Sequence, residues 1–311
     1  MGKKKIAVTI RSFDRESVYF RRLQELFEIR YLNRTGYRLE KPDLIKAIES
    51  CEGVIAGTEI FDGEVLASAP SLGVLSRVGV GMDSIDLDYA RLHNIRVFNT
   101  PNAPVGAVAE HALALILSLL KRIPRYDRNV KDGDLSVLPG ELICGMTVGV
   151  IGLGRIGFRV ASLLSCLGAK ILFFDPYLVK TSGIPPEWVR AGSLESVLSR
   201  ADLVTLHATP SPDHRPLLDS PAFSSCKKGI IIINTARESL IDEEALIAAI
   251  GGGVVGGAAL DVFGTGRIAA LADASPDVIL TPHIASNTRQ SRREMEDEAV
   301  RNLIQGLEGF P

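Results

Sequence analysis

The stretch VGVIGLGRIGFRVASLL, residues 148–164, decides the fold of the region that contains it. An apolar, strand-like run leads into Gly152-x-Gly154-x-x-Gly157, and a segment with helical periodicity follows. The first glycine permits a tight turn, the second lets a pyrophosphate approach the backbone, and the third allows close packing of helix on strand. Because strand, turn and helix accompany the glycines, the motif predicts a dinucleotide-binding turn rather than an ordinary glycine loop. Exposed amides at the helix start bind anions, so the predicted pyrophosphate-binding residues are Gly152, Gly154, Arg155, Ile156 and Gly157.

The next strand of this region ends in an acidic residue. Asp175, within FFDPY, follows Gly157 by 18 positions. A carboxylate at this place accepts hydrogen bonds from the adenosine ribose hydroxyls and repels a 2′-phosphate. The predicted cofactor is therefore NAD rather than NADP.

The glycine turn belongs to the second of two halves that alternate strand-like and helix-like segments. A long apolar helix is expected over 104–122, between the halves, and helical periodicity recurs at segments such as 16–27 and 41–50. The expected strands are 5–10, 27–32, 53–57, 73–79 and 95–100, then 146–152, 169–175, 203–208, 229–235, 254–263 and 277–282. This alternation predicts an α/β protein with two doubly wound parallel sheets, each covered by helices on both faces.

The C-terminal segment bears on how the domains are connected. Residues 288–310 have the pattern of one amphipathic helix, which we expect to pack back on the first domain. The chain would then cross between domains near 101–104 and near 284–288, which predicts a ligand cleft with two hinges. The predicted domains are a flavodoxin-like substrate domain of residues 1–101 and 286–311 and an inserted Rossmann NAD-binding domain of residues 102–285.

Composition narrows the class of protein. A chain of 311 residues is long enough for two domains, and 46% hydrophobic residues argue against disorder. A net charge of −2 gives no general attraction to nucleic acid or anionic membrane. The most apolar run, 111–120, is too short to span a bilayer, and the N-terminus does not have the pattern of a signal peptide. Four dispersed cysteines have no metal-binding spacing and are expected to be buried thiols in a soluble, cytoplasmic protein without a metal.

Several motifs in one order resemble the D-isomer-specific 2-hydroxyacid dehydrogenase family. They are SRVGVGMDSIDLDYA (76–90), NTPNAPVGAVAEHALALIL (99–117), VIGLGRIG, FFDPY, INTARE and LTPHIAS, and together they cover nearly the whole chain. The resemblance implies an NAD-dependent oxidoreductase that interconverts a small D-2-hydroxy acid and its 2-oxo acid. It also implies a homodimer formed through the cofactor domain.

The resemblance assigns the substrate contacts by position. The backbone amides of Val80 and Gly81 would hold the substrate carboxylate. Arg237 would bind the carboxylate and the carbonyl oxygen, a task suited to a guanidinium because it is always charged and donates through paired N–H groups. His283 would act as general acid in reduction and general base in oxidation.

The resemblance also extends the predicted cofactor site. Asp261, in LDVF, matches the position that contacts the nicotinamide carboxamide, and His207 is expected to line the cofactor pocket. The three remaining histidines have no partner pattern and are expected to be structural: His93, His111 and His214.

One expected residue is absent. The family carries a glutamate in a DVFxxEP-like turn behind the catalytic histidine, but here the turn is DVFGTGRIA, with Gly266 at that position and no Glu between Glu244 and Glu294. Without a carboxylate partner, a histidine of ordinary pKa is protonated in roughly a quarter of molecules at pH 7. Reduction should then be slower at neutral pH, by about one to two orders of magnitude if the orientation of the ring is lost as well. The conceivable substitutes are Asp273, Asp277, Glu238 or a water molecule, and of these Glu238 is expected to point away from its neighbour Arg237.

The loop that faces the substrate tail, residues 56–65, contains no Arg or Lys. This weakens the case for a phosphorylated substrate such as 3-phosphoglycerate. The loop does carry Glu59 and Asp62, of which Glu59 is interpreted as a solvated residue, and Arg11 could supply a positive charge nearby. The missing glutamate also leaves an alternative function open, namely an NAD(H)-binding regulatory or interaction protein with little or no turnover.

Overall fold

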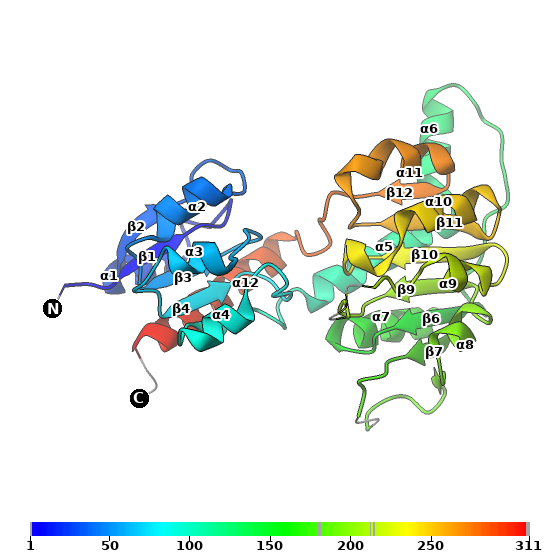
Figure 1. Cartoon of the computed structure of the whole chain (residues 1–311). Helices are drawn as coiled ribbons and strands as arrows, with labels where there is room; N and C mark the ends of the chain where they lie inside the picture. Colours follow the sequence, from blue (N-terminus) through cyan, green and yellow to red (C-terminus); the bar gives the residue numbers. More distant parts are fainter. Residues whose placement is uncertain (1, 180–181, 212, 214, 309–311) are drawn as a thin grey trace. The chain divides into compact units, whose positions relative to one another are not determined.

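The computed structural model describes residues 2–179, 182–211, 213 and 215–308, and it divides the chain into two compact units. Unit 1 comprises Met1–Pro104 with Thr288–Pro311, and unit 2 comprises Val105–Asn287. The sequence predicted these divisions at 101–102 and 285–286. Each unit is described by itself below (Figure 1).

Unit 1 contains a five-stranded, fully parallel sheet in the order β2-β1-β3-β4-β5. The strands are β1 (Lys5–Val8), β2 (Glu28–Leu32), β3 (Gly53–Ala56), β4 (Val74–Arg77) and β5 (Arg96–Phe98). The helices are α1 (Val18–Leu26), α2 (Lys41–Ile48), α3 (Gly63–Ala67), α4 (Leu87–Leu92) and α12 (Arg289–Glu308). This strand order is that of flavodoxin-like folds.

Helices cover both faces of the unit 1 sheet. One core cluster joins the sheet to α2, α3 and α4, and the other joins it to α1 and α12. The C-terminal helix therefore packs on the sheet of unit 1. Its approach is close, because a Cβ atom at Gly53 would lie 2.8 Å from the Leu303 and Leu307 side chains.

Unit 2 contains a seven-stranded parallel sheet in the order β12-β11-β10-β9-β6-β7-β8. The strands are β6 (Thr147–Ile151), β7 (Lys170–Phe174), β8 (Val189–Arg190), β9 (Leu203–Leu206), β10 (Ile230–Asn234), β11 (Val255–Leu260) and β12 (Val278–Leu280). The strand order reverses between β6 and β9, and ligands of open α/β sheets bind outside the carboxyl ends of strands at such a reversal.

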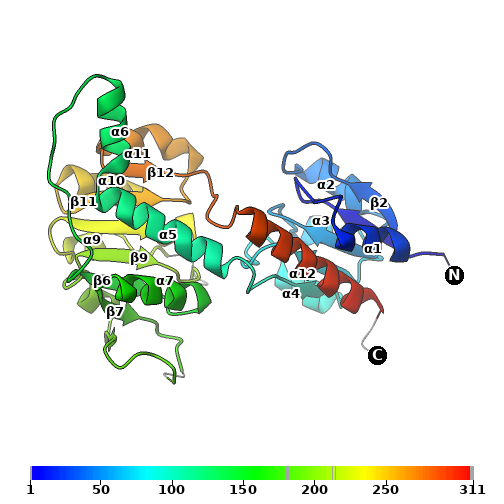
Figure 2. The same cartoon turned by 180° about the vertical axis from the view of Figure 1, so that it is seen from behind.

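The helices of unit 2 form a layer on each face of the sheet (Figure 2). One core cluster contains α5 and α7, and the other contains α8, α9, α10 and α11. The helices of unit 2 are α5 (Val105–Leu120), α6 (Ile123–Lys131), α7 (Arg155–Cys166), α8 (Leu194–Leu198), α9 (Ser220–Ser224), α10 (Glu243–Gly251) and α11 (Ile268–Ala274). The predicted fold class, two doubly wound parallel sheets, is confirmed.

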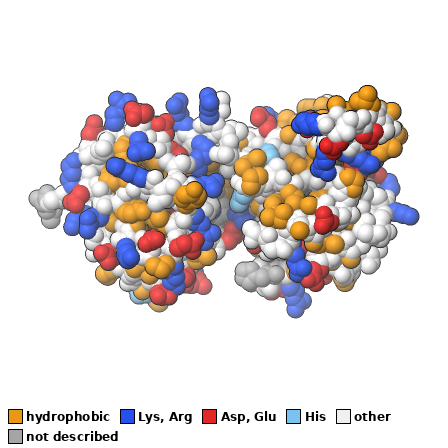
Figure 3. Space-filling view, turned by 90° about the horizontal axis from the view of Figure 1, so that it is seen from above, with side chains coloured by type: hydrophobic (Ala, Val, Ile, Leu, Met, Phe, Trp, Pro, Cys, Tyr) orange, Lys and Arg blue, Asp and Glu red, His pale blue; other side chains and the backbone are white. Residues whose placement is uncertain are grey.

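Three structural findings concern the predictions made from composition. Within the described residues, no helix combines the length and the apolar character that a membrane crossing requires. In the face that Figure 3 presents, positive and negative side chains are interspersed on both units. The expectation that all four cysteines are buried is wrong for Cys144 and Cys166, which are exposed because they lie in the turn before β6 and at the end of α7.

Candidate active site

The glycine turn of unit 2 has the geometry that its three glycines predict. Gly152 has a φ of +86°, and a Cβ atom there would lie 2.8 Å from the backbone of His207. A Cβ atom at Gly157 would lie 2.0 Å from the carbonyl oxygen of Gly152, so only glycine permits this contact of helix and strand. A Cβ atom at Gly154, in contrast, would meet nothing within 4 Å. The turn is thus closed toward the protein at two glycines and open outward at the third.

The first turn of α7 presents uncapped amides next to this open side. Gly154 is the N-cap residue of α7 and has no side chain to cap it, so the amides of Arg155, Ile156 and Gly157 have no capping partner in the described structure. Such amides and the helix dipole favour an anion. A pyrophosphate fits this place by chemistry and by space.

Asp175 connects the end of β7 to the glycine turn. Its Oδ2 accepts a hydrogen bond from the amide of Leu153 at 2.8 Å, and its Oδ1 accepts one from the amide of Tyr177 at 2.9 Å. Each carboxylate oxygen has a further lone pair. The carboxylate is therefore fixed in direction while retaining capacity to accept hydroxyl groups.

His207 follows β9, at the reversal of strand order. One ring nitrogen, Nε2, lies 2.9 Å from Oγ1 of Thr205. Burial lowers the pKa of the His207 ring to about 4, so the ring is neutral at physiological pH. A neutral ring at this place would not act as a cationic contact, and the role of His207 in a cofactor pocket stays a prediction.

This depressed pKa predicts a pH-dependent stability. The pKa of His207 is about 4 in the folded state and 6.5 without perturbation, so the unfolded chain takes up the proton first. The stabilisation is present above pH 6.5 and decreases as the pH falls toward 4. Between pH 7 and pH 5 the ligand-free protein should lose at most about 2 kcal/mol of unfolding free energy through this ring.

Urea unfolding at both pH values would measure the effect. The His207→Gln variant, which keeps a side chain able to bond Thr205, should lose correspondingly less stability over the same interval. An equal loss in both proteins would contradict the assignment to this ring.

Arg237 stands on a loop that a buried asparagine holds. Asn234, at the end of β10, is 1% exposed; its Nδ2 donates to the carbonyl oxygen of Arg237 at 2.8 Å, and its Oδ1 accepts from the amide of Ala236 at 3.0 Å. The guanidinium of Arg237 donates to the carbonyl oxygen of Ala236 at 2.7 Å. The neighbouring Glu238 is exposed and begins a short 3-10 turn, Glu238–Leu240. Sequence analysis missed Asn234, because its role is to bond main-chain atoms.

A buried carboxylate lies under the loop that carries His283. The side chain of Asp261 is fully buried, and its Oδ1 accepts from the Thr281 hydroxyl at 2.5 Å and the Ile284 amide at 2.9 Å. Its Oδ2 accepts from the Ala285 amide at 2.9 Å. Burial acts to raise the pKa of Asp261, but hydrogen bonds from His111, Thr281 and the two amides outweigh it and hold the pKa below its usual range.

His111 belongs to the same cluster, although no sequence pattern suggested a partner for it. Its Nε2 lies 3.2 Å from Oγ1 of Thr281 and 3.4 Å from Oδ1 of Asp261. The two other histidines expected to be structural have separate outcomes. His93 stacks on Tyr89 with ring centroids 4.0 Å apart, and His214 lies outside the described residues.

The region where the family's glutamate was expected is helical and faces solvent. Gly266 is exposed in a 3-10 turn, Thr265–Arg267, that leads into α11. Of the conceivable substitutes, Asp277 forms ion pairs with Arg122 at 2.6 Å and with Arg125 at 3.5 Å. Asp273 is exposed. One carboxylate that contacts the His283 loop is that of Asp261.

In unit 1, side-chain hydrogen bonds fix the loop that is predicted to bind the substrate carboxylate. The guanidinium of Arg77 donates to the carbonyl oxygens of Gly57, at 3.2 Å, and of Gly81. The side chain of Asn99 donates to the carbonyl oxygen of Val80 at 2.6 Å. Val80 itself is 37% exposed. These bonds use the carbonyl groups of Val80 and Gly81 and leave their amides available. Arg77 and Asn99 were not among the predicted residues.

The loop predicted to face the substrate tail differs from expectation at Glu59. The interpretation of Glu59 as a solvated residue is wrong, because its side chain is 1% exposed and accepts a hydrogen bond from the Gly57 amide at 2.7 Å. Burial raises the pKa of this carboxyl. Asp62 caps α3 through the Val65 amide and pairs with Lys41 at 2.9 Å. Both carboxylates thus have structural partners.

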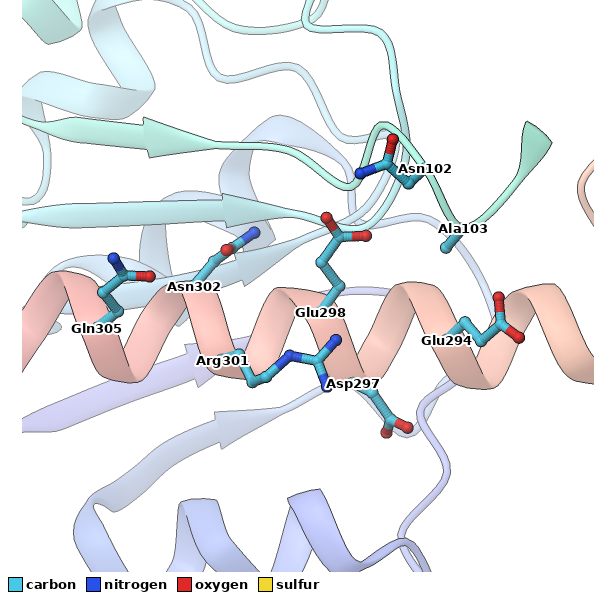
Figure 4. Close-up of a pocket in the computed structure, with 8 residues that line it drawn as sticks. All are labelled: Asn102, Ala103, Glu294, Asp297, Glu298, Arg301, Asn302 and Gln305. Atoms are coloured by element: carbon cyan, nitrogen blue, oxygen red, sulfur yellow. The ribbon is translucent and has the colours of Figure 1, made fainter. Parts of the chain in front are cut away.

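The described residues contain a cavity of about 600 Å³ that none of the candidate site residues lines. It lies in unit 1 along α12, bordered by Asn102 and Ala103 (Figure 4). Its other lining residues are polar: Glu294, Asp297, Glu298, Arg301, Asn302 and Gln305. Among the described residues, no group of His, Cys, Asp and Glu side chains could hold a metal ion.

Comparison with known proteins supplies the family. Residues 113–285 match the family model of the D-isomer specific 2-hydroxyacid dehydrogenase NAD binding domain. The D-3-phosphoglycerate dehydrogenase of Mycobacterium tuberculosis is 35% identical over 278 residues, which cover 87% of this chain and 52% of that protein. The hydroxypyruvate reductase of Thermotoga maritima is 32% identical over 283 residues, covering 89% of this chain and 91% of that one. The chain thus spans about half the length of the D-3-phosphoglycerate dehydrogenases that it matches.

Solved structures agree with the sequence comparison. The D-lactate dehydrogenase of Aquifex aeolicus, solved with NAD and lactic acid, superposes with a TM-score of 0.85 at 27% identity and covers 98% of this chain and 96% of its own. The TT0316 protein of Thermus thermophilus superposes with a TM-score of 0.86 at 33% identity, covering 98% and 97% of the two chains. Fold, motifs and near-complete coverage agree, and the chain belongs to the D-isomer-specific 2-hydroxyacid dehydrogenase family, with its NAD-binding domain in unit 2.

Proposed function

We propose that the protein is an NAD-dependent oxidoreductase that interconverts a small D-2-hydroxy acid and its 2-oxo acid. One observation carries the proposal: four strands of a single parallel sheet direct their carboxyl ends to the glycine turn, to Arg237, to Asp261 and to the His283 loop. This is the edge at which open α/β sheets bind ligands. Arg237 and His283 supply the two functions that a carbonyl reduction requires, a cation for the substrate and a proton donor.

Each predicted residue has a role in this proposal. Arg237 binds the substrate carboxylate and polarises the carbonyl oxygen, and His283 gives its proton to that oxygen as the hydroxyl forms. When bound, the nicotinamide cofactor supplies the hydride. The amides of Val80 and Gly81, from unit 1, hold the carboxylate. The cofactor's contacts are proposed to be Gly152, Gly154, Arg155, Ile156, Gly157, Asp175 and His207.

The proposed substrate is small and not phosphorylated. The loop at 56–65 contains no cationic side chain, and its carboxylates at Glu59 and Asp62 are occupied by Gly57 and Lys41. The loop itself therefore offers no cationic side chain to a phosphate group.

The test is NADH consumption by the purified protein with glyoxylate, pyruvate, hydroxypyruvate and phosphohydroxypyruvate, scanned from pH 5 to 8. The proposal expects turnover of at least one unphosphorylated acid and a lower kcat/KM for the phosphorylated one. NADH binding without turnover of any of these acids would overturn it in favour of the alternative, a regulatory NAD-binding protein.

The glycine turn gives a prediction that separates cofactor binding from folding. Gly154→Ala should keep the melting temperature, because the added methyl meets no protein atom, yet raise the Kd for NADH about tenfold or more by standing where the pyrophosphate approaches. Gly192→Ala, also in open space, is the matched control and should change neither quantity. Gly157→Ala should instead destabilise the fold through its contact with Gly152. Calorimetry measures the melting temperature, and NADH fluorescence measures the Kd. An unchanged Kd in Gly154→Ala would contradict the proposed cofactor site.

We also propose a homodimer formed by an arm of unit 2, residues 123–142. None of the residues of α6 is buried, and the segment after it exposes Leu135 (77%), Val137 (84%) and Leu142 (70%). The arm nevertheless has a fixed shape, since Tyr126 accepts from the Leu138 amide at 2.6 Å and Lys121 donates to the Glu141 carbonyl at 2.7 Å. Figures 1 and 2 show α6 and this segment at the margin of unit 2. Apolar side chains held outward by polar bonds support a protein partner, and the family resemblance makes a second copy the expected one.

Light scattering after gel filtration tests the arm. The wild-type protein should be a dimer, and the double variant Leu135→Asp, Val137→Asp should be a monomer. Leu92→Asp, which replaces an equally exposed leucine of unit 1, should remain dimeric. A monomeric wild-type protein would refute the proposal. We further propose a cytoplasmic location, where exposed free thiols such as Cys144 remain reduced.

A further inference from the structure

The backbone at His283 has a conformation that needs support. Its φ is +55°, in the left-handed region that residues other than glycine rarely adopt. Such a conformation persists only where the surroundings enforce it. The question is therefore which groups enforce it in a chain that has no glutamate between Glu244 and Glu294.

Several hydrogen bonds of the segment around His283 lead to Asp261. The amide of His283 donates to the carbonyl oxygen of Asp261 at 2.9 Å. The next two amides, of Ile284 and Ala285, donate to the two carboxylate oxygens of Asp261, and the Thr281 hydroxyl donates to the same carboxylate. Residues on both sides of His283 are thus attached to Asp261, and the carboxylate lies in a nest of consecutive amides.

A second element fixes the carboxylate from the other side. His111, in the middle of α5, places Nε2 between Oγ1 of Thr281 and Oδ1 of Asp261, at 3.2 and 3.4 Å. The helix α5 is packed on β11 and β12, which carry Asp261 and the His283 loop at their ends. The side chain of His111 is 19% exposed and that of Asp261 is fully buried, so this contact is not a surface pair.

We propose that Asp261 is the positioning residue for His283 and that His111 anchors it. In this chain the carboxylate acts on the amides of the loop and so sets where the imidazole stands. The proposal rests on the proposed function, in which His283 moves the proton. It differs from the expected contact of Asp261 with the nicotinamide carboxamide, because three loop donors and His111 surround its two oxygens.

The two roles predict different kinetics. Loss of a carboxamide contact would weaken cofactor binding and raise the KM for NADH. Loss of positioning would lower kcat, since a displacement of about 1 Å of a catalytic group can cost about 10²-fold in rate. In Asp261→Asn an amide NH₂ would face a loop donor, so we expect kcat to fall about 100-fold. We expect the KM for NADH to change less than about threefold.

A matched control separates positioning from general destabilisation. Asp202 is a partly buried carboxylate of the same unit that accepts the Thr147 amide at 2.8 Å, at the amino end of β9 rather than at the carboxyl edge. Asp202→Asn should lower the melting temperature but leave kcat within about twofold. His111→Leu should lose about tenfold in activity. His111→Gln retains an N–H donor and should restore most of that loss.

Amide hydrogen exchange provides a readout that does not require turnover. In Asp261→Asn the amides of residues 283–285 should lose protection while those of β6 and β9 keep it. If the wild-type protein turns over no 2-oxo acid, the proposed function fails, and exchange alone still decides the positioning. Should Asp261→Asn not fold, Thr281→Val and His111→Leu carry the same tests.

Three outcomes would overturn the proposal. They are unchanged protection at 283–285 in the variants, a KM for NADH raised tenfold with kcat intact, and an equal loss of kcat in Asp202→Asn and Asp261→Asn. The first would remove the attachment, the second would restore the carboxamide role, and the third would reduce the effect to stability.

Discussion

Replacing Arg237 by Gln should lower kcat/KM for the 2-oxo acid by about 10³-fold or more while leaving the Kd for NADH within about twofold. A guanidinium binds a carboxylate through two parallel, charge-assisted hydrogen bonds, and removing one partner of such a pair costs about 2–5 kcal/mol. The loop itself should survive, because Asn234 bonds the backbone at residues 236 and 237 rather than the side chain. Arg237→Lys keeps the charge but not the paired donors, so an intermediate loss of about 10²-fold is expected.

Steady-state kinetics with saturating NADH measures this effect. Arg267→Gln is the matched control, since Arg267 is an exposed arginine of the same unit that pairs with Glu244; its kcat/KM should stay within about twofold. An Arg237→Gln protein with wild-type kcat/KM would contradict the assignment of the substrate carboxylate to Arg237. Failure to bind NADH would instead place Arg237 in the cofactor site.

The parts of the fold that sequence analysis predicted are those in which pattern and burial coincide. The glycine turn was predicted from the spacing of its three glycines, of which Gly152 and Gly157 answer a local steric need. The long helix expected over 104–122 corresponds to α5, and the helix expected over 288–310 corresponds to α12, because both bury an apolar face along their length. Local periodicity is sufficient where it reports on burial in a core.

In the elements that were not predicted, no apolar pattern in the sequence coincides with burial. The two-residue strand β8 is exposed, and α6 buries no residue, so neither has an apolar pattern facing the core of unit 2. The arm of residues 123–142 keeps its shape through hydrogen bonds between side chains and main-chain groups. Such bonds leave no periodic trace in a sequence.

In the candidate site, too, some residues could be predicted from the sequence and others could not. Residues with a motif, such as Arg237 and His283, were predicted from the family resemblance and from their place after apolar strands. Asn234, under Arg237, and Arg77, under the loop of unit 1, were not predicted, because they bond main-chain atoms. His111 meets Asp261 across 150 positions of sequence, a contact that only the packing of α5 on the sheet creates.

Replacing His283 by Gln should lower kcat for reduction by about 10³-fold with little change in the KM for either substrate. A positioned proton donor contributes about 10² to 10⁴ in rate, and glutamine retains much of the size and polarity of histidine but cannot release a proton. The substrate should still bind, because Arg237 and the loop at Val80 and Gly81 are unaltered. NADH should bind normally for the same reason.

The pH dependence distinguishes loss of the proton donor from loss of structure. Under the proposed function, reduction in the wild-type protein consumes the protonated ring, so its rate should decrease as the pH rises and the rate of oxidation should increase. In His283→Gln the residual rates should lose both dependences. His93→Gln, which changes a histidine stacked on Tyr89 in unit 1, should retain the wild-type profile. If His283→Gln kept the wild-type rate and profile, the proton would have to come from water or from another acid, and the support that Asp261 gives to the loop would serve the fold alone.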